Sequence, residues 1–180
     1  MFRRIVLLCV MGSLATPLAY GRPDQVIIIR HAEKPEHGHD LTMKGRERAA
    51  ALAPFFLSGD NGTPAAIYAQ GPSNEHPSRR PVETVTPVAR ELKLELKTCH
   101  RGDDAEMVKE ILSKPEYDGK VVLICWSHKE IPGLATALGV ANPPAWRDSA
   151  FDRLWIIKLK DGKATLQDLP QRLLFGDSAE

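Results

Sequence analysis

The sequence has little net charge, no internal repeat and no low-complexity tract. Its 24 Lys and Arg residues nearly balance 23 Asp and Glu residues, which leaves a formal net charge of +1 at pH 7. A chain with so small a charge has no overall field that attracts nucleic acid or an anionic membrane surface. We therefore expect no nucleic-acid partner, and any affinity for anions has to be local. The 180 residues fit one domain with a substantial hydrophobic core.

Long hydrophobic runs are also scarce, and the run near the N-terminus is too short to cross a membrane permanently. Arg3 and Arg4 precede an apolar run at residues 5–14, and small residues follow at 19–21. This pattern predicts a secretory signal peptide over residues 1–21 and a single domain over residues 22–180. The mature protein would be periplasmic or secreted, without stable membrane insertion. The alternative is a retained N-terminal anchor or a first strand.

Cysteine is rare, with three residues in the chain. Removal of the signal peptide takes Cys9 away and leaves Cys99 and Cys125. In an oxidising compartment these two can form a disulfide. Cys125, however, lies in an apolar run, where a free thiol behaves as a small hydrophobic side chain. The sequence leaves both possibilities open.

Two apolar runs, residues 26–29 and 121–126, have the length and β-branched content of buried strands. Weaker strand patterns occur at 65–68 and 94–96, and the alternation at 153–159 and 164–169 predicts a hairpin. Helical patterns cover about 43–57, 81–92, the stretch after Asp103 or Asp104, and about 131–138; Pro54 and Pro87 should bend the first two. This order predicts an α/β protein, a three-layer α/β/α sandwich with a mostly parallel sheet and a C-terminal antiparallel hairpin.

Each of the two long strands ends in a histidine. Arg30-His31 follows the first strand, and Ser127-His128 follows the second. Ligands of open parallel sheets bind at the carboxyl ends of the strands. A cation and two imidazoles held at that edge by rigid strands are well placed to meet an anion.

Four motifs resemble those of the histidine phosphatase superfamily, whose members share the phosphoglycerate-mutase-like fold. They occur in the family's order and read Ile29-Arg30-His31-Ala32-Glu33, Leu41-Thr42-x-x-Gly45, Ser78-Arg79-Arg80-Pro81-x-Glu83-Thr84 and Ser127-His128. The resemblance extends from about residue 26 to residue 139 and is that of a small, exported, branch-1 type member. The loop at 71–77 is longer than the usual connection in the family.

The resemblance implies that His31 is the nucleophile and forms a phosphohistidine that water then hydrolyses. An imidazole has to be neutral to attack, and neighbouring positive charge disfavours its protonated form. A backbone carbonyl bound to one ring nitrogen would leave the other nitrogen free. Arg30 and Arg80 carry planar guanidinium groups suited to the oxygens of a phosphoryl group. A protonated His128 would add a donor to the same oxygens.

The same residues have simpler interpretations. Both histidines can be tied down at strand ends without any chemical role, and Arg30 can be a surface ion-pair partner. Of the two adjacent arginines, spacing to Thr84 favours Arg80 in the phosphate pocket, which leaves Arg79 solvated or on the substrate rim.

A leaving group needs a proton donor, and the sequence offers two candidates. Family members often supply a carboxyl group from the segment after the third strand, here residues 97–106, which favours Asp103. That residue also begins a capping box, Asp103-Asp104-Ala105-Glu106, and helix capping alone would explain it. Glu33 is the second candidate, although it can instead orient a neighbouring histidine or arginine.

No metal or other cofactor is expected. His37-Gly38-His39 lies in a polar loop and can bind divalent ions only weakly, since a dedicated site usually needs more ligands and an outer shell of hydrogen bonds.

These observations predict an exported, metal-independent phosphoric monoester hydrolase that acts through His31. Its substrate would be a small phosphorylated molecule, for example an envelope glycolipid or a sugar phosphate. One alternative is a protein phosphohistidine phosphatase. Another is a non-catalytic phosphate-binding module that keeps the cationic pocket without a working acid.

Overall fold

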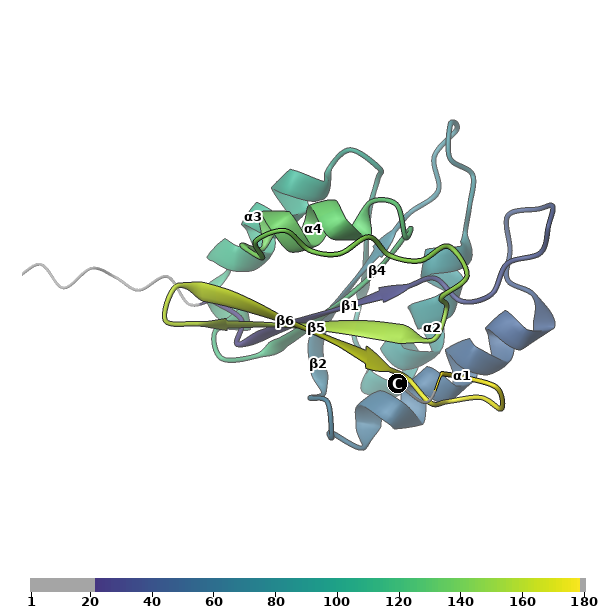
Figure 1. Cartoon of the computed structure of the whole chain (residues 1–180), viewed down its shortest axis with the longest axis horizontal. Helices are drawn as coiled ribbons and strands as arrows, with labels where there is room; N and C mark the ends of the chain where they lie inside the picture. Colours follow the sequence, from purple (N-terminus) through teal and green to yellow (C-terminus); the bar gives the residue numbers. More distant parts are fainter. Residues whose placement is uncertain (1–21, 179–180) are drawn as a thin grey trace, which may run out of the picture.

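The computed structural model describes residues 22–178, which form a six-stranded sheet with helices on both faces (Figure 1). The predicted signal peptide lies outside the described residues. The elements in order are β1 (Gln25–Arg30), α1 (Met43–Leu57), β2 (Pro64–Gln70), α2 (Arg80–Leu92), β3 (Leu96–Cys99), α3 (Asp104–Ser113), the 3₁₀ turn η1 (Pro115–Tyr117), β4 (Val121–Trp126), α4 (Ile131–Ala137), β5 (Arg153–Lys160) and β6 (Lys163–Pro170). The predicted α/β sandwich with a C-terminal hairpin is confirmed.

The strand order is β3-β2-β4-β1-β5-β6, and pairing changes from parallel to antiparallel at β1. This strand runs parallel to β4 on one side and antiparallel to β5 on the other. Ile27 and Ile29 pack into the core with α1 and α2, whereas Val26 and Ile28 pack into the core with α3 and α4. Because β1 is buried on both faces, its sequence is continuously apolar rather than alternating.

The start of α1 is fixed to the chain that follows β1. Thr42 caps the helix as predicted, since its Oγ1 accepts a hydrogen bond of 3.1 Å from the Gly45 amide. The Thr42 amide in turn donates to the Glu33 carbonyl at 3.0 Å. Gly45 allows this close approach, because a Cβ at that position would lie 2.5 Å from the Glu33 carbonyl oxygen. The Leu-Thr-x-x-Gly motif therefore joins a helix to the loop that carries His31.

The third strand begins later than the pattern at 94–96 predicts. Lys93 ends α2 in the left-handed conformation, with φ of 55°. The Leu94 amide donates to the Ala89 carbonyl at 2.9 Å, and Leu94 packs against the core beneath α2. This is the hydrogen-bonding and hydrophobic contact of a helix C-terminus, so Leu94 belongs to the helix end and pairing starts at Leu96. Both α1 and α2 also continue past their internal prolines, Pro54 and Pro87.

Cys99 and Cys125 are both free thiols. They lie on β3 and β4, which are separated in the sheet by β2. Two strand spacings amount to about 10 Å, well beyond the Cα separation that a disulfide spans. The structure thus favours the buried-thiol interpretation of Cys125.

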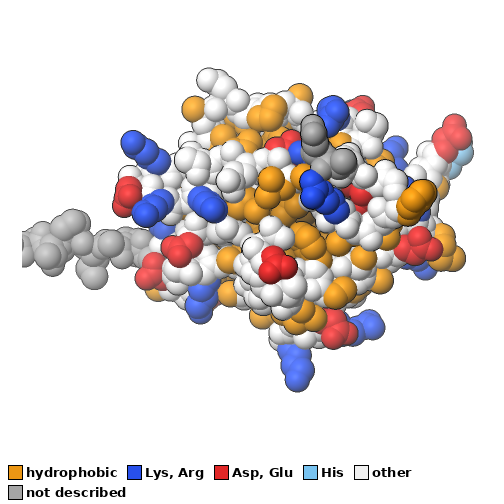
Figure 2. Space-filling view, turned by 60° about the horizontal axis from the view of Figure 1, so that its bottom comes forward, with side chains coloured by type: hydrophobic (Ala, Val, Ile, Leu, Met, Phe, Trp, Pro, Cys, Tyr) orange, Lys and Arg blue, Asp and Glu red, His pale blue; other side chains and the backbone are white. Residues whose placement is uncertain are grey.

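Figure 2 shows one face of the molecule, on which Lys and Arg side chains and Asp and Glu side chains both lie around a central hydrophobic area. Over residues 22–178, none of the helices combines the length and apolar character needed to cross a membrane.

Candidate active site

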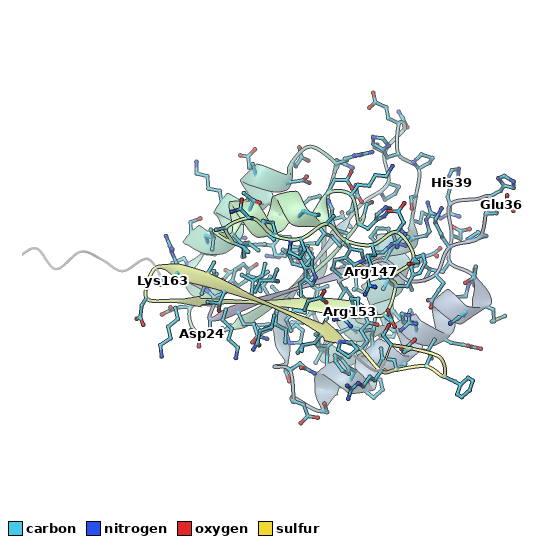
Figure 3. All side chains as sticks on the ribbon, viewed as in Figure 1. Asp24, Glu36, His39, Arg147, Arg153 and Lys163 are labelled. Carbon is cyan, nitrogen blue, oxygen red and sulfur yellow. The ribbon has the colours of Figure 1, made fainter. Side chains whose placement is uncertain are left out.

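The ends of β1 and β4 bring the two histidine motifs to one edge of the sheet. Arg30 is paired with Trp126, the last residue of β4, and the His31 amide donates to the Trp126 carbonyl at 3.1 Å. Ser127-His128 therefore leaves the sheet beside Arg30-His31. In Figure 3, His39 and Arg147 lie toward this end of the molecule, and Asp24 and Lys163 lie toward the other.

His31 is buried, with 5% of its surface exposed. Its Nδ1 atom lies 2.7 Å from the Ala32 carbonyl oxygen, so Nδ1 carries the proton and Nε2 keeps its lone pair. Burial lowers the pKa of His31 to about 3; the Ala32 carbonyl opposes this shift, and Arg30, Arg80 and His128 add to it. The imidazole is consequently neutral near pH 7. The flanking charge expected from the sequence contributes to this neutrality, but burial is the larger cause.

The loop after His31 is held by α2. The Ala32 amide donates a hydrogen bond of 2.9 Å to Thr84 Oγ1, and this hydroxyl donates to the Arg80 carbonyl at 2.7 Å. The neighbouring Glu83 carboxylate accepts from the Leu41 amide at 2.8 Å. The Glu-Thr pair of the second arginine motif thus connects the loop after His31 to the helix that begins with Arg80, a role that the sequence pattern does not indicate.

Arg30 is almost completely buried, with 1% of its surface exposed, so the surface ion-pair interpretation is wrong. Its guanidinium carbon lies 3.8 Å from the centre of the Phe151 ring, and Nη1 donates to the Asp148 and Ala150 carbonyls. The Nε atom is buried without a hydrogen-bond partner among the described residues. Burial lowers the pKa of Arg30 to about 10, which still leaves the group charged at neutral pH.

Arg80 and Arg79 have separate environments. Arg80 lines a cleft of about 240 Å³ together with His31, Gln70, Glu75, Arg101 and Ser127. Its Nε donates to Ser78 Oγ at 2.9 Å. Arg79 is exposed and forms two hydrogen bonds of 2.8 Å with the Asp40 carboxylate, outside the residues that line the cleft. The structure places Arg80, and not Arg79, beside His31.

His128 is mostly buried beside Arg30. Its Nδ1 atom is buried and has no hydrogen-bond partner within residues 22–178. Its Nε2 atom lies 2.9 Å from Asp148 Oδ1, in a charge contact rather than a well-aligned hydrogen bond. Burial lowers the pKa of His128, and Arg30 adds to the effect, whereas Asp148 opposes it.

Glu33 points away from the cleft. Its carboxylate accepts hydrogen bonds of 3.1 Å and 2.8 Å from the buried Arg48, whose guanidinium also binds Asp177 at 2.6 Å. These residues line a second cavity, of about 260 Å³, that does not include His31. Glu33 therefore orients an arginine, the alternative that the sequence leaves open for it.

Asp103, the other predicted proton donor, is exposed and is not among the residues that line the cleft. It occupies the N-cap position of α3, but its side chain makes no capping hydrogen bond. Its carboxylate instead accepts from the preceding His100 amide at 3.2 Å. The predicted capping interaction is wrong, because the turn at 100–103 aims this carboxylate back toward residue 100.

Sequence reasoning misses two parts of the site. Glu75 is the carboxylate among the residues that line the cleft, and it comes from the polar loop at 71–78, where no periodic pattern marks any position. The segment at 146–151 brings Asp148 and Phe151 against His128 and Arg30, and it too lies outside any helix or strand.

Within the described chain there is no group of three or more His, Cys, Asp or Glu residues arranged to hold a metal ion.

No protein-family model matches this chain, and no curated protein matches it in sequence. Solved structures do match it. The phosphoglycerate mutase of Bacillus anthracis strain Sterne is similar over 84% of this chain and 94% of its own, with a TM-score of 0.53 and 14% identity. The phosphoserine phosphatase of Entamoeba histolytica, solved with 3-phosphoglyceric acid, is similar over 83% and 99%, with a TM-score of 0.51 and 14% identity. The chain therefore shares the fold of these two proteins.

Proposed function

We propose that this protein is a metal-independent phosphatase that hydrolyses a phosphomonoester through a phosphohistidine at His31. The observation that carries the proposal is a pair of buried donors, Arg30 Nε and His128 Nδ1, that have no partners in the described chain. Buried polar groups are nearly always hydrogen-bonded in native proteins, so donors left over beside a neutral imidazole indicate a site built for an anion. Arg80 adds a third cationic group at the same place.

The proposed reaction has two steps. His31 Nε2 attacks phosphorus, the phosphorus–oxygen bond of the ester breaks, and the leaving oxygen takes a proton from solvent water, because neither predicted proton donor lines the cleft. Water then cleaves the phosphorus–nitrogen bond, which releases phosphate and restores the neutral imidazole. Arg30, Arg80 and a protonated His128 stabilise the negative charge of the transferring group, which is the main requirement in phosphoryl transfer.

The cleft supports a small polar substrate. Its volume of about 240 Å³ accommodates a phosphoryl group with a modest leaving group, and most of its lining side chains are polar or charged. The structural relatives include a phosphoserine phosphatase, which is consistent with a phosphomonoester. We favour a sugar phosphate or a phosphorylated glycolipid head group of the cell envelope, because residues 1–21 have the pattern of an export signal.

The test is the covalent intermediate. The purified full chain is incubated with p-nitrophenyl phosphate without metal, quenched in alkali, and digested for mass spectrometry of the peptide that contains His31. We expect a phosphohistidine that is stable in alkali and lost in acid, together with release of phosphate. His31→Ala should abolish both, whereas His37→Ala, a change at an exposed histidine, should preserve both.

A phosphate-binding module without activity is the second candidate, and it is favoured by the position of both predicted proton donors outside the cleft. Binding of inorganic phosphate in calorimetry, without a phosphoenzyme or product, would establish the module and refute the phosphatase.

Export is tested separately: the protein should appear in the periplasmic or culture fraction with its N-terminus near Arg22, and a cytoplasmic chain that keeps Met1 would refute export.

A further inference from the structure

We propose that Asp148 is a positioning residue that favours the protonated, hydrogen-bond-donating form of the His128 imidazole at the phosphoryl site. This inference rests on the proposed function, because His128 is expected to donate to a phosphoryl oxygen. Asp148 lies outside the four motifs and comes from the irregular segment between α4 and β5.

The backbone on both sides of Asp148 is fixed by buried groups. Arg30 Nη1 donates to the carbonyl oxygens of Asp148 and, at 3.2 Å, of Ala150. The Ala150 carbonyl also accepts from Trp146 Nε1 at 2.9 Å, and the Phe151 ring stacks on the Arg30 guanidinium. A buried arginine on the central strand therefore sets the position of residue 148.

The Asp148 side chain is 87% exposed, yet its Oδ1 lies 2.9 Å from His128 Nε2. A contact made through Nε2 leaves the buried Nδ1 as the nitrogen that can donate to a phosphoryl oxygen. Both nitrogens carry protons only in the imidazolium form, so the contact and the donation require the same protonation state.

The other charges near His128 oppose this state. Burial has the largest effect and lowers the pKa of His128, and the Arg30 guanidinium from β1 and the adjacent Lys129 lower it further. Asp148 is the charged group in this set that raises it. The His31 ring, which also faces His128, is neutral near pH 7 because of its own low pKa. Without Asp148, every remaining influence favours loss of the proton.

The geometry does not suit Asp148 as a donor of protons to the leaving group. The Asp148 carboxylate contacts His128 Nε2 and is not among the residues that line the cleft with His31. Its effect on catalysis should therefore pass through His128 and should not depend on how basic the leaving group is.

The experiment compares Asp148→Asn with wild type in the full chain. Rates are measured across pH with p-nitrophenyl phosphate, whose leaving group needs little protonation, and with glycerol 3-phosphate, whose leaving group needs it strongly. We expect kcat/KM for both substrates to fall by a similar factor, about tenfold above neutral pH. The alkaline limb of the plot of kcat/KM against pH should move down by about one pH unit. Asp148→Glu should restore part of the loss. Asp161→Asn, at the hairpin turn far from the site, should match wild type.

A second measurement does not depend on activity. NMR titration of the His128 ring in wild type and Asp148→Asn should show a lower midpoint in the variant, in about the amount by which the alkaline limb moves. An unchanged midpoint would overturn the proposal. A loss confined to glycerol 3-phosphate would also overturn it, because it would make Asp148 the proton donor. If wild type forms no phosphohistidine, the proposed phosphatase function fails, and the NMR midpoints still decide whether Asp148 controls His128.

Discussion

Thr84 Oγ1 accepts a hydrogen bond of 2.9 Å from the amide of Ala32, the residue that follows the proposed nucleophile. The change Thr84→Val keeps the shape of this side chain but leaves a buried amide without an acceptor. We expect it to lower the free energy of unfolding by about 1 to 3 kcal/mol and to lower kcat as the His31 loop shifts. Urea denaturation and steady-state kinetics measure the two effects.

Thr86→Val on the same helix is the matched control. Thr86 Oγ1 donates to the Val82 carbonyl at 2.7 Å, much as Thr84 does to Arg80, but it has no hydrogen bond to the His31 loop. Its kcat should stay close to wild type. Equal losses of kcat in the two variants would contradict the positioning role of Thr84.

The adjacent arginines should respond very differently to substitution. Arg80→Gln removes a cation from the cleft, and we expect kcat/KM to fall by about two to three powers of ten, as when a single donor to the transition state is deleted. Arg79→Gln breaks an exposed ion pair with Asp40 that solvent screens, and it should change kcat/KM only slightly. If Arg79→Gln lost more kcat/KM than Arg80→Gln, the assignment of Arg80 to the phosphoryl group would be wrong.

Gly45→Ala should destabilise the protein, although alanine normally favours a helix. The added Cβ would lie 2.5 Å from the Glu33 carbonyl oxygen, so backbone has to move at an expected cost of about 1 to 3 kcal/mol. Gly133→Ala in α4 meets nothing within 4 Å and should be neutral or stabilising. Urea denaturation compares the free energies of unfolding of the two variants. A Gly45→Ala protein as stable as wild type would contradict the expected clash between the added Cβ and the Glu33 carbonyl.

Asp177 should make stability depend on pH in the acid range. Burial raises the pKa of this carboxyl, but hydrogen bonds from Arg48 and from the amides of Leu174 and Leu173 outweigh it and bring the pKa to about 2. A pKa below the unfolded value means that the stabilisation is complete above about pH 4 and is lost as pH falls through 2. Asp177→Asn should therefore cost about 2 to 3 kcal/mol at pH 7 and progressively less toward pH 2. Unfolding curves at several pH values measure this difference, and a constant difference would contradict it.

The fold follows from the sequence wherever burial leaves a periodic signature. The run at residues 121–126 becomes β4 with the predicted bounds, and Thr42 caps α1, because continuous apolar runs and capping side chains are local signals. Long-range contacts leave no such signal. Arg48 looks like an ordinary surface residue of a helix, yet it is 2% exposed because the distant Asp177 and Glu33 surround it.

The residues of the candidate site also divide into those that local sequence signals predict and those that they do not. Residues fixed by strand ends, such as His31 and His128, meet at the edge that the parallel pairing predicts. Glu75, Arg101 and Asp148 come from irregular segments, where neither spacing nor hydrophobicity specifies which side chain lies beside the site. The two predicted proton donors, Asp103 and Glu33, both lie away from the cleft for this reason.

The origin of the residues that line the cleft indicates how the substrate specificity of such a protein could change. His31 and Arg80 line the cleft from elements anchored in the hydrophobic cores, whereas other lining residues come from the loop at 71–78 and from Arg101 in the turn at 100–103. Surface connections tolerate insertion and exchange far better than buried strands do. Evolution, or a laboratory library confined to those two connections, could therefore redraw the preference for the alcohol half of the ester while the chemical machinery stays untouched.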